Sequence, residues 1–436
     1  MKKTLLIISI TISLMLSASP AFAGGSSPDQ PTQRPEFGYG SAENYICETL
    51  YTGNGINENN AIDFGDTNDG TRCWVFIPSV LKNDATAPVV IYLHGFMAIV
   101  PPIYQGQIEH LVRQGYIVIF PEYNLGGFAG MFNDTDQYEQ LDRAIEAVDI
   151  ALALPDVAER AELNEIVLAS HSNGGNLSMG WVAGGGVDVK AMVMQHPCIS
   201  NEAIPAFVRD LFLGDMTEVD YAADGPAITC PVIIIGGRDD TIAKVEDFSA
   251  LYQALPNAST KVYYQYETDE HGEPILESDH MVPAQSDGAI PGFILDLMSG
   301  MGISAFEYSS DDFRIHFAAV DAALDDQTRV TFNRGEWSDG VAVKPVITLA
   351  DSENDAVSVY QHGNFGGYFA ELPPGEYTLS DLRALGIEND DLSSIRVPAG
   401  IQATVYQHDN FGGTSQVYTS DANLAINDDA SSIIVE

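Results

Sequence analysis

The stretch Ile166-Val-Leu-Ala-Ser-His-Ser-Asn-Gly-Gly-Asn-Leu-Ser-Met179 decides the fold that this chain can adopt. Its first four residues form an apolar run typical of a buried β-strand, and its last residues are compatible with a helix. A serine at so sharp a strand-to-helix turn projects its hydroxyl out of the sheet. Its neighbours must be small because the backbone folds back on itself. Ser172 is therefore the candidate nucleophile.

The motif departs from the usual G-x-S-x-G pattern because Ser170 stands where the first glycine is expected. A serine is small, so the turn remains buildable. On the motif alone, a glycine-rich loop that caps a helix is an open alternative.

Short β-branched runs alternate with amphipathic stretches between Pro88 and Tyr266. The expected strands are Val89 to His94, Tyr116 to Pro121, Glu165 to Ser170, Lys190 to His196, Pro231 to Gly237 and Lys261 to Tyr266. The expected helices are Ile108 to Gln114, Tyr138 to Leu154 and Val245 to Leu255. This alternation predicts an α/β fold with a mainly parallel sheet, whose ligands bind at the carboxyl ends of the strands.

An acid and a base follow the serine at such strand ends. Asp240 lies after the strand that ends at Gly237, and we favour it over Asp239 because G-x-x-D followed by a polar and an aliphatic residue is typical of this loop. His280 lies beyond the last parallel strand. We favour it over His271, whose acidic neighbours indicate an exposed turn. The chain order serine, acid, base is that of an α/β-type hydrolase.

An oxyanion-binding turn is expected where the strand Val89 to His94 ends in His-Gly. The backbone N–H groups of Phe96 and Asn173 are the candidate donors to the charge of a tetrahedral intermediate. His94 itself is expected to be structural. Phe96 and Met97 either line an apolar subsite or serve in packing.

Together these motifs resemble the α/β-hydrolase superfamily over about Ala85 to Gly300, nearest to secreted cutinase-like, dienelactone-hydrolase-like and chlorophyllase-like esterases. The resemblance implies ester hydrolysis through an acyl-enzyme, with Ser172, His280 and Asp240 as the triad. Such a reaction needs no metal or organic cofactor. We place this domain at residues 37–345 and leave the role of its last part, 301–345, open.

The C-terminal part contains an internal repeat: Val359-Tyr-Gln-His-Gly-Asn-Phe-Gly-Gly367 recurs as Val405-Tyr-Gln-His-Asp-Asn-Phe-Gly-Gly413. Each copy is followed by Asn-Asp-Asp-x-Ser-Ser-Ile, and short alternating runs punctuated by turn residues predict an all-β module. Residues 356–436 resemble a microbial βγ-crystallin domain of two Greek keys. A linker is expected at residues 346–355.

The resemblance implies two calcium sites, each built from both Asn-Asp-Asp-x-Ser-Ser loops, because calcium prefers hard oxygen ligands. The implied ligands are Gln361, Asp390, Asp391, Ser393, Gln407, Asp428, Asp429 and Ser431. A merely polar turn is the alternative. The aromatic residues of the repeat are expected to lie in the core and at hairpin corners.

Residues Met1 to Ala23 resemble a cleavable signal peptide, with two lysines, a short apolar run and an A-x-A site. This predicts a secreted or periplasmic protein, which we expect to be a monomer with no membrane span. Residues 24–36 are expected to form a flexible leader.

The charge is strongly acidic, with 62 acidic against 19 basic residues and a net charge of -43. This disfavours nucleic acid and anionic membranes as partners. Saline surroundings or calcium would screen the charge, although exported proteins are also commonly acidic.

Four cysteines in an exported chain allow three disulfide connectivities. We favour a bridge between Cys47 and Cys73, since it would staple a loop rich in Asn, Asp and Gly. Cys198 and Cys230 are expected at opposite edges of a parallel sheet, beyond bridging distance, and so free and buried.

Two classes of function are therefore compared. The first is a secreted serine ester hydrolase whose calcium-binding module supplies stability or surface attachment. The second is a calcium-binding structural or adhesive protein with an inactive hydrolase-like domain. A serine peptidase of the same fold would use the same triad.

Overall fold

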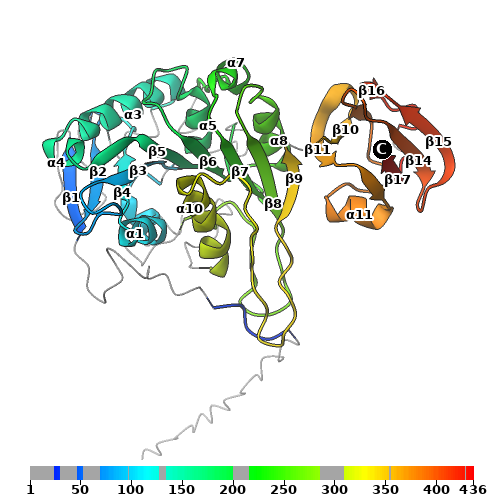
Figure 1. The fold of residues 1–436 in the computed structure, drawn as a ribbon, viewed down its shortest axis with the longest axis horizontal. Helices are drawn as coiled ribbons and strands as arrows, with labels where there is room; N and C mark the ends of the chain where they lie inside the picture. The colour runs from blue at the N-terminus through cyan, green and yellow to red at the C-terminus, as the bar shows by residue number, and fades with distance from the viewer. Residues whose placement is uncertain are drawn as a thin grey trace, which may run out of the picture.

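A computed structural model of the 436-residue chain describes residues 24–29, 47–52, 69–96, 98–126, 134–199, 216–284, 309–352, 355–427 and 429–436. It contains one nine-stranded sheet covered by helices and two four-stranded antiparallel sheets near the C-terminus (Figure 1). The α/β and all-β parts expected from the sequence are thus both present. The signal-peptide prediction at 1–23 lies outside the described residues.

The large sheet has the strand order β1-β2-β4-β3-β5-β6-β7-β8-β9. Its strands are β1 Cys47–Thr52, β2 Cys73–Pro78, β3 Ala87–Leu93, β4 Ile117–Pro121, β5 Ala161–His171, β6 Ala191–Gln195, β7 Val232–Gly237, β8 Lys261–Tyr266 and β9 Ile347–Asp351. Strands β3 to β8 run parallel, whereas β1, β2 and β9 pair antiparallel with their neighbours. The six expected strands correspond to β3 to β8. Their nearly continuous apolar runs fit strands buried on both faces.

Helices cover both faces of this sheet. One face carries α3 Gln137–Leu152, α5 Asn173–Gly180 and α8 Val245–Gln253, and the other carries α1 Gln105–Arg113 and α10 Ala318–Leu324 (Figure 1). The shorter helices are η1 Pro101–Ile103, α4 Pro155–Ala158, α7 Tyr221–Asp224 and η4 Gly225–Ala227. The side chain of Asp136 caps α3 by accepting from the N–H groups of Tyr138 and Glu139.

The segment after the predicted catalytic motifs completes the large α/β domain, which we call the hydrolase domain after the resemblance seen in its sequence. It begins with the π-helix η5, Asp312–Phe317, continues as α10 beneath β5 and β6, and ends in β9. The expected linker at 346–355 is therefore wrong for Ile347–Asp351, which pairs with β8. Without β9, the edge of β8 would leave a row of unpaired backbone groups.

The favoured disulfide between Cys47 and Cys73 is also wrong. The β1–β2 ladder pairs Cys73 with Thr52 and Cys47 with Pro78, so the two cysteines lie at opposite ends of the ladder. Five residues of strand span about 17 Å, whereas a disulfide needs Cα atoms within about 7 Å. Cys73 is buried and forms no disulfide within the described part of the chain. Cys198 and Cys230 are half-buried rather than buried.

Residues 24–29 of the expected flexible leader pack against the hydrolase domain. Ser26 forms a parallel bridge with Glu273, and its N–H donates to the Oγ of Ser338 at 2.8 Å. This part of the leader is therefore held by the hydrolase domain. Residues 30–36 lie outside the described residues.

The C-terminal part forms two sheets, with the orders β11-β10-β13-β16 and β12-β17-β14-β15. Its elements are β10 Val357–His362, η6 Gly363–Phe365, β11 Gly366–Leu372, β12 Gly375–Tyr377, α11 Leu379–Ala384, β13 Ser394–Arg396, β14 Ala403–His408, β15 Gly412–Tyr418, β16 Ala422–Asn423 and β17 Ser432–Val435. Each sheet combines three strands of one repeat with one strand of the other. This exchange is the connectivity of paired Greek keys.

The two repeats have matching hairpin corners. Phe365 lies edge-on to Tyr360 with ring centroids 5.7 Å apart, and Phe411 lies edge-on to Tyr406 at the same distance. The backbone N–H of each phenylalanine donates at 3.0 Å to a serine hydroxyl, that of Ser394 or Ser432. These aromatics therefore stabilise the corners, as expected from the sequence.

Strand β11 lies against β9 and α8, so the two domains share an interface (Figure 1). Glu371 on β11 accepts from the N–H of Asp351 at 2.8 Å and from the hydroxyl of Tyr252 at 3.3 Å. The ring of Tyr252 also contacts that of Phe369, with centroids 5.6 Å apart. A half-buried carboxyl thus bridges the hydrolase and crystallin-like domains.

Ionisation of Glu371 is expected to weaken this interface as the pH rises. Burial raises the pKa of Glu371 to about 7, from an ordinary value of 4.5. Because the folded-state pKa is raised, the stabilisation is complete below the ordinary value and is lost as the pH rises through about 7. Glu371→Gln keeps an acceptor for the Asp351 N–H and removes the charge. Between about pH 5 and about pH 8, the wild type should lose up to about 3 kcal/mol of unfolding free energy relative to the variant. Urea unfolding at both pH values measures this difference, and a constant difference contradicts the prediction.

Candidate active site

Ser172 lies at the turn between β5 and α5 in a conformation that few side chains adopt, with φ 54° and ψ −121°. The two glycines that follow are required by close packing. A Cβ on Gly174 would lie 2.3 Å from the carbonyl oxygen of Leu93, and one on Gly175 would lie 2.4 Å from the Cβ of Pro197. The turn therefore has the geometry expected from the sequence, with Ser170 accommodated in place of glycine.

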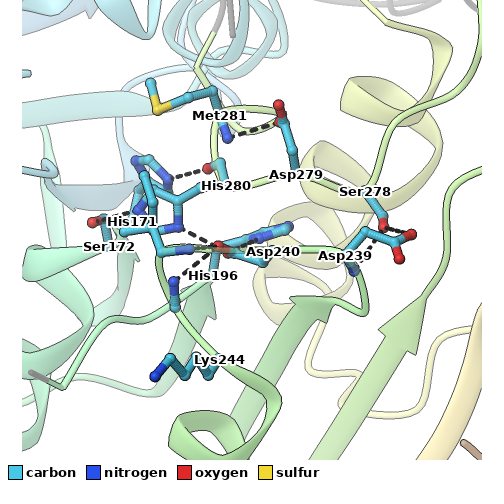
Figure 2. Close-up of polar contacts among 12 residues, drawn as sticks. His171, Ser172, His196, Asp239, Asp240, Lys244, Ser278, Asp279, His280 and Met281 are labelled. Carbon is cyan, nitrogen blue, oxygen red and sulfur yellow. Dashed lines mark hydrogen bonds and ion pairs between the residues drawn. The ribbon is translucent and has the colours of Figure 1, made fainter. Parts of the chain in front are cut away.

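Ser172, His280 and Asp240 form one hydrogen-bonded chain (Figure 2). The Nε2 of His280 lies 2.7 Å from the Oγ of Ser172, and its Nδ1 lies 2.8 Å from the Oδ2 of Asp240. All three residues are buried. The structure thus brings together the three residues selected from the sequence, which lie up to 108 positions apart in the chain.

Asp240 is held as a carboxylate by donors on both oxygens. Its Oδ1 accepts from the N–H groups of Ile242 and Ala243, each at 2.8 Å. Burial alone would raise the pKa of Asp240, but the charge of His280 and the hydrogen bonds from His196 and His280 outweigh it and hold the pKa well below the ordinary range. Asp240 is therefore negatively charged at all physiological pH values.

His171 joins the loop of the base to the loop of the predicted oxyanion turn. Its Nε2 lies 2.8 Å from the carbonyl oxygen of His280, and its Nδ1 lies 2.9 Å from the hydroxyl of Tyr104. That hydroxyl also accepts from the N–H of Gly95 at 2.8 Å. Burial and the nearby charge of His280 lower the pKa of His171 well below its ordinary value, so it is neutral. Both loops are thereby fixed to the turn that carries Ser172.

The residues chosen as oxyanion donors belong to two segments next to Ser172. A Cβ on Gly95 would lie only 3.0 Å from the Cβ of Ser172, which places the loop of Phe96 directly against the serine. Asn173 is the first residue of α5, where backbone N–H groups have no partner within the helix. Its side chain is fixed by the Nε2 of Gln137 at 2.6 Å. Met97 lies outside the described residues.

The two rival residues have other partners. Asp239 accepts from the N–H of Thr268 and the hydroxyl of Ser278, both at 2.9 Å. His271 bonds the carboxylate of Asp339 at 2.8 Å and is about one-third exposed. Figure 2 shows Asp239 turned toward Ser278 and away from the imidazole of His280.

One member of the site was not identified from the sequence. The Nδ1 of His196, the residue directly after β6, lies 2.8 Å from the same Oδ2 of Asp240 that faces His280. Its position at a strand's carboxyl end was the available signal, since the site was expected there. His196, Asp240 and His280 also form a possible metal-ligand group. The atoms that could bind a metal already form hydrogen bonds with one another, so we interpret the group as a hydrogen-bonded network.

Loops from the two crystallin-like repeats bring oxygen atoms together. The hydroxyl of Ser431 lies 3.4 Å from the Oδ1 of Asp390 and 2.9 Å from the backbone oxygen of Gln407. These three ligand candidates come from both repeats. Two further ligand candidates also contact each other: the Nε2 of Gln361 donates to the carboxylate of Asp391 at 3.0 Å.

The remaining calcium candidates are only partly described. Ser393 is buried, its N–H donating to the carbonyl oxygen of Tyr360 at 2.9 Å, and Asp429 accepts from the Nε2 of Gln407 at 2.6 Å. Asp428 lies outside the described residues.

No helix within the described part of the chain is long and apolar enough to cross a membrane.

The sheet, the elbow and the paired Greek keys define an α/β-hydrolase domain followed by a βγ-crystallin domain. Residues 56–193 match the family model described as Chlorophyllase. The resemblance seen in the sequence is therefore confirmed for both parts of the chain.

Curated and solved relatives resemble the crystallin domain. Development-specific protein S of Myxococcus xanthus is 42% identical over 81 residues, which are 18% of this chain and 47% of that protein. Its homolog from the same organism is 44% identical over 50 residues, 12% of this chain and 29% of the relative. This chain thus spans less than half the length of these relatives. The crystal structure of the N-terminal domain of protein S is 41% identical, and a βγ-crystallin domain from Flavobacterium johnsoniae is 46% identical. Each covers 19% of this chain and 94% of the other, with a TM-score of 0.18.

Proposed function

We propose that this protein is an exported, monomeric serine hydrolase that cleaves carboxylic esters through an acyl-enzyme. The observation that carries the proposal is the 2.7 Å contact between the Oγ of Ser172 and the Nε2 of His280, with Asp240 behind the imidazole. The match to the chlorophyllase family supports a hydrolase of esters. Export is supported by the signal-like pattern of residues 1–23.

In the proposed reaction, the Oγ of Ser172 attacks the ester carbonyl carbon while His280 takes the hydroxyl proton. Asp240 stabilises the imidazolium that forms, and the N–H groups of Phe96 and Asn173 bind the oxyanion. The C–O bond to the alcohol then breaks, and His280 returns the proton to the leaving oxygen. Water, activated by the same imidazole, adds to the acyl-enzyme and releases the acid.

The test is hydrolysis of a panel of p-nitrophenyl esters of increasing acyl length by the purified chain. We expect turnover of short-chain esters and stoichiometric labelling of one serine by a fluorophosphonate. We propose the loops 124–133 and 201–225 as the pocket walls. Most of both lies outside the described residues, so the panel also supplies the acyl preference. Cleavage of peptide but not ester substrates would replace this proposal with a peptidase.

We further propose that the crystallin domain binds calcium for stability or attachment. The donor set fits, since a carboxylate, a hydroxyl and a backbone oxygen converge from the two repeats, and calcium prefers such hard oxygen ligands. When bound, the ion would be held by Asp390, Ser431 and Gln407 and would link the two Greek keys. A calcium-binding structural role without catalysis is the second candidate, supported by the similarity to protein S.

Calcium is expected to raise the melting temperature of the full chain. A ligand present at one hundred times its Kd stabilises the folded state by about 2.7 kcal/mol. Asp390→Ala should reduce this response, because it removes a carboxylate from the predicted site. Asp355→Ala is the control, since it removes an exposed carboxylate outside both loops. Calorimetric titration that detects no binding at millimolar calcium would contradict the site.

A further inference from the structure

Asp240 is shared by two histidines. The Nδ1 atoms of His196 and His280 both lie 2.8 Å from the same oxygen, Oδ2 (Figure 2). The proposed reaction uses only His280. His196 is fully buried and has a φ of 44°, a left-handed conformation that is costly for a residue with a side chain. Such strain indicates that the surrounding contacts hold His196 in place.

The hydrogen-bonded chain continues behind His196. Its Nε2 lies 2.9 Å from the hydroxyl of Tyr266, and that hydroxyl lies 3.0 Å from the Nε2 of His316. His316 is fully buried on the π-helix η5, a rare element that is frequently found at functional sites. The segment whose role was open in the sequence therefore supplies the far end of this chain.

The position of the ring proton on His316, at the far end of the chain, determines the direction of the hydrogen bonds. The Nδ1 of His316 has no partner among the described residues. Burial lowers the pKa of His316 well below its ordinary value, so the ring is neutral and carries one proton. If Nδ1 held that proton, a buried N–H donor would be left unpaired, and orphaned buried N–H groups are rarer in proteins than unpaired acceptors. The proton is therefore on Nε2 and points at Tyr266. The hydroxyl of Tyr266 then donates to His196, and His196 donates to Asp240.

We propose that His196 is a positioning residue that draws electron density from Asp240, so that the catalytic imidazole of His280 stays unprotonated to lower pH. This inference rests on the proposed ester hydrolysis. Every donor of the chain points toward the carboxylate, and such chains polarise one another. A carboxylate with four hydrogen bonds attracts the proton of an adjacent imidazolium less strongly than one with three.

Other ionisable groups also face this chain. The two neighbouring histidines are His171, which contacts His280, and His316. The charged groups are Asp247, Asp279, Asp311 and Arg334. The variants below leave all of them in place, so a change in pH dependence reports on the His196 link.

The test compares kcat/KM against pH for the wild type and four variants of the full chain. His196→Leu removes the donor to Asp240. We expect the acidic limb of its kcat/KM–pH profile to move to higher pH by about 0.5 to 1 unit. His196→Asn can still donate from Nδ2, and asparagine tolerates the left-handed backbone, so its limb should stay within about 0.2 unit of the wild type. Tyr266→Phe should shift the limb in the same direction by a smaller amount, because His196 becomes a weaker donor. Tyr92→Phe is its matched control, since it removes another buried hydroxyl, bonded to Gln195 at 3.2 Å.

The proposal is overturned if folded His196→Leu keeps the wild-type limb, or if His196→Asn shifts as far as His196→Leu. Should His196→Leu not fold, an equal limb in Tyr266→Phe and Tyr92→Phe overturns it. NMR of protein labelled with 15N-histidine supplies a readout without turnover. We expect two downfield Nδ1–H signals in the wild type, and a lower titration midpoint of the His280 ring than in Tyr266→Phe. An absence of ester turnover with these NMR results intact would refute the proposed function but not the His196 link.

Discussion

Replacing Ser172 with alanine is expected to lower kcat/KM for ester hydrolysis by about 10⁴- to 10⁶-fold. The substitution removes the hydroxyl oxygen that lies 2.7 Å from the Nε2 of His280 and leaves the turn otherwise unchanged. Alanine is as small as serine at this crowded position, so the melting temperature should stay close to that of the wild type. Activity assays with calorimetry of the same samples measure both quantities.

Ser170→Ala is the matched control for this experiment. Ser170 is fully buried two residues earlier, and its hydroxyl has no hydrogen-bond partner in the part of the chain that the structure describes. Removing it should change kcat/KM by less than about tenfold and leave stability unchanged or slightly improved. Substantial turnover in Ser172→Ala, or an equal loss in both variants, would exclude Ser172 as the nucleophile.

Replacing Arg334 with methionine is expected to destabilise the hydrolase domain by about 3 to 5 kcal/mol. Arg334 forms two hydrogen bonds with Asp311, at 3.1 and 2.7 Å, and the side chains are only 1% and 0% exposed. The methionine variant leaves the charge of Asp311 buried without its partner. Urea unfolding of the variant measures the loss of free energy.

Two further variants separate this effect from a general loss of charge. Arg334→Met combined with Asp311→Leu should recover part of the stability, since no unpaired charge then remains. Arg160→Ala removes an arginine that is about one-third exposed and lies 3.9 Å from the exposed Asp156, and it should cost less than about 1 kcal/mol. If Arg334→Met and Arg160→Ala have equal effects, the buried pair does not stabilise this domain.

The parallel strands and the elbow could be predicted because their signals are local. A buried parallel strand is an apolar run, and a sharp turn after it needs small residues around Ser172. Once the strands are known, their carboxyl ends lie along one edge of the sheet, so Asp240 and His280 could be selected with few rivals. The loops proposed to bind calcium could be selected for a similar reason, because Asp390 and Asp428 occupy equivalent positions in the two copies of the sequence repeat.

Pairings between distant elements could not be predicted in this way. The register of β1 against β2 separates Cys47 from Cys73, and register depends on the whole sheet. Strand β9 was assigned to a linker because its short polar and apolar mixture looks the same in a loop and at a sheet edge. His196 carries no motif, and its partners Asp240 and Tyr266 lie 44 and 70 residues away.

The sequence by itself indicated two domains, the position of the candidate nucleophile and the order of the candidate serine, acid and base, because hydrophobic periodicity and turn chemistry act between near neighbours. Only the tertiary structure decided that Asp240 serves two histidines, that the segment after the hydrolase motifs reaches the site through His316, and that Glu371 joins the domains. These contacts depend on how separate elements pack. The local sequence around one of these residues does not indicate which distant residue will lie next to it.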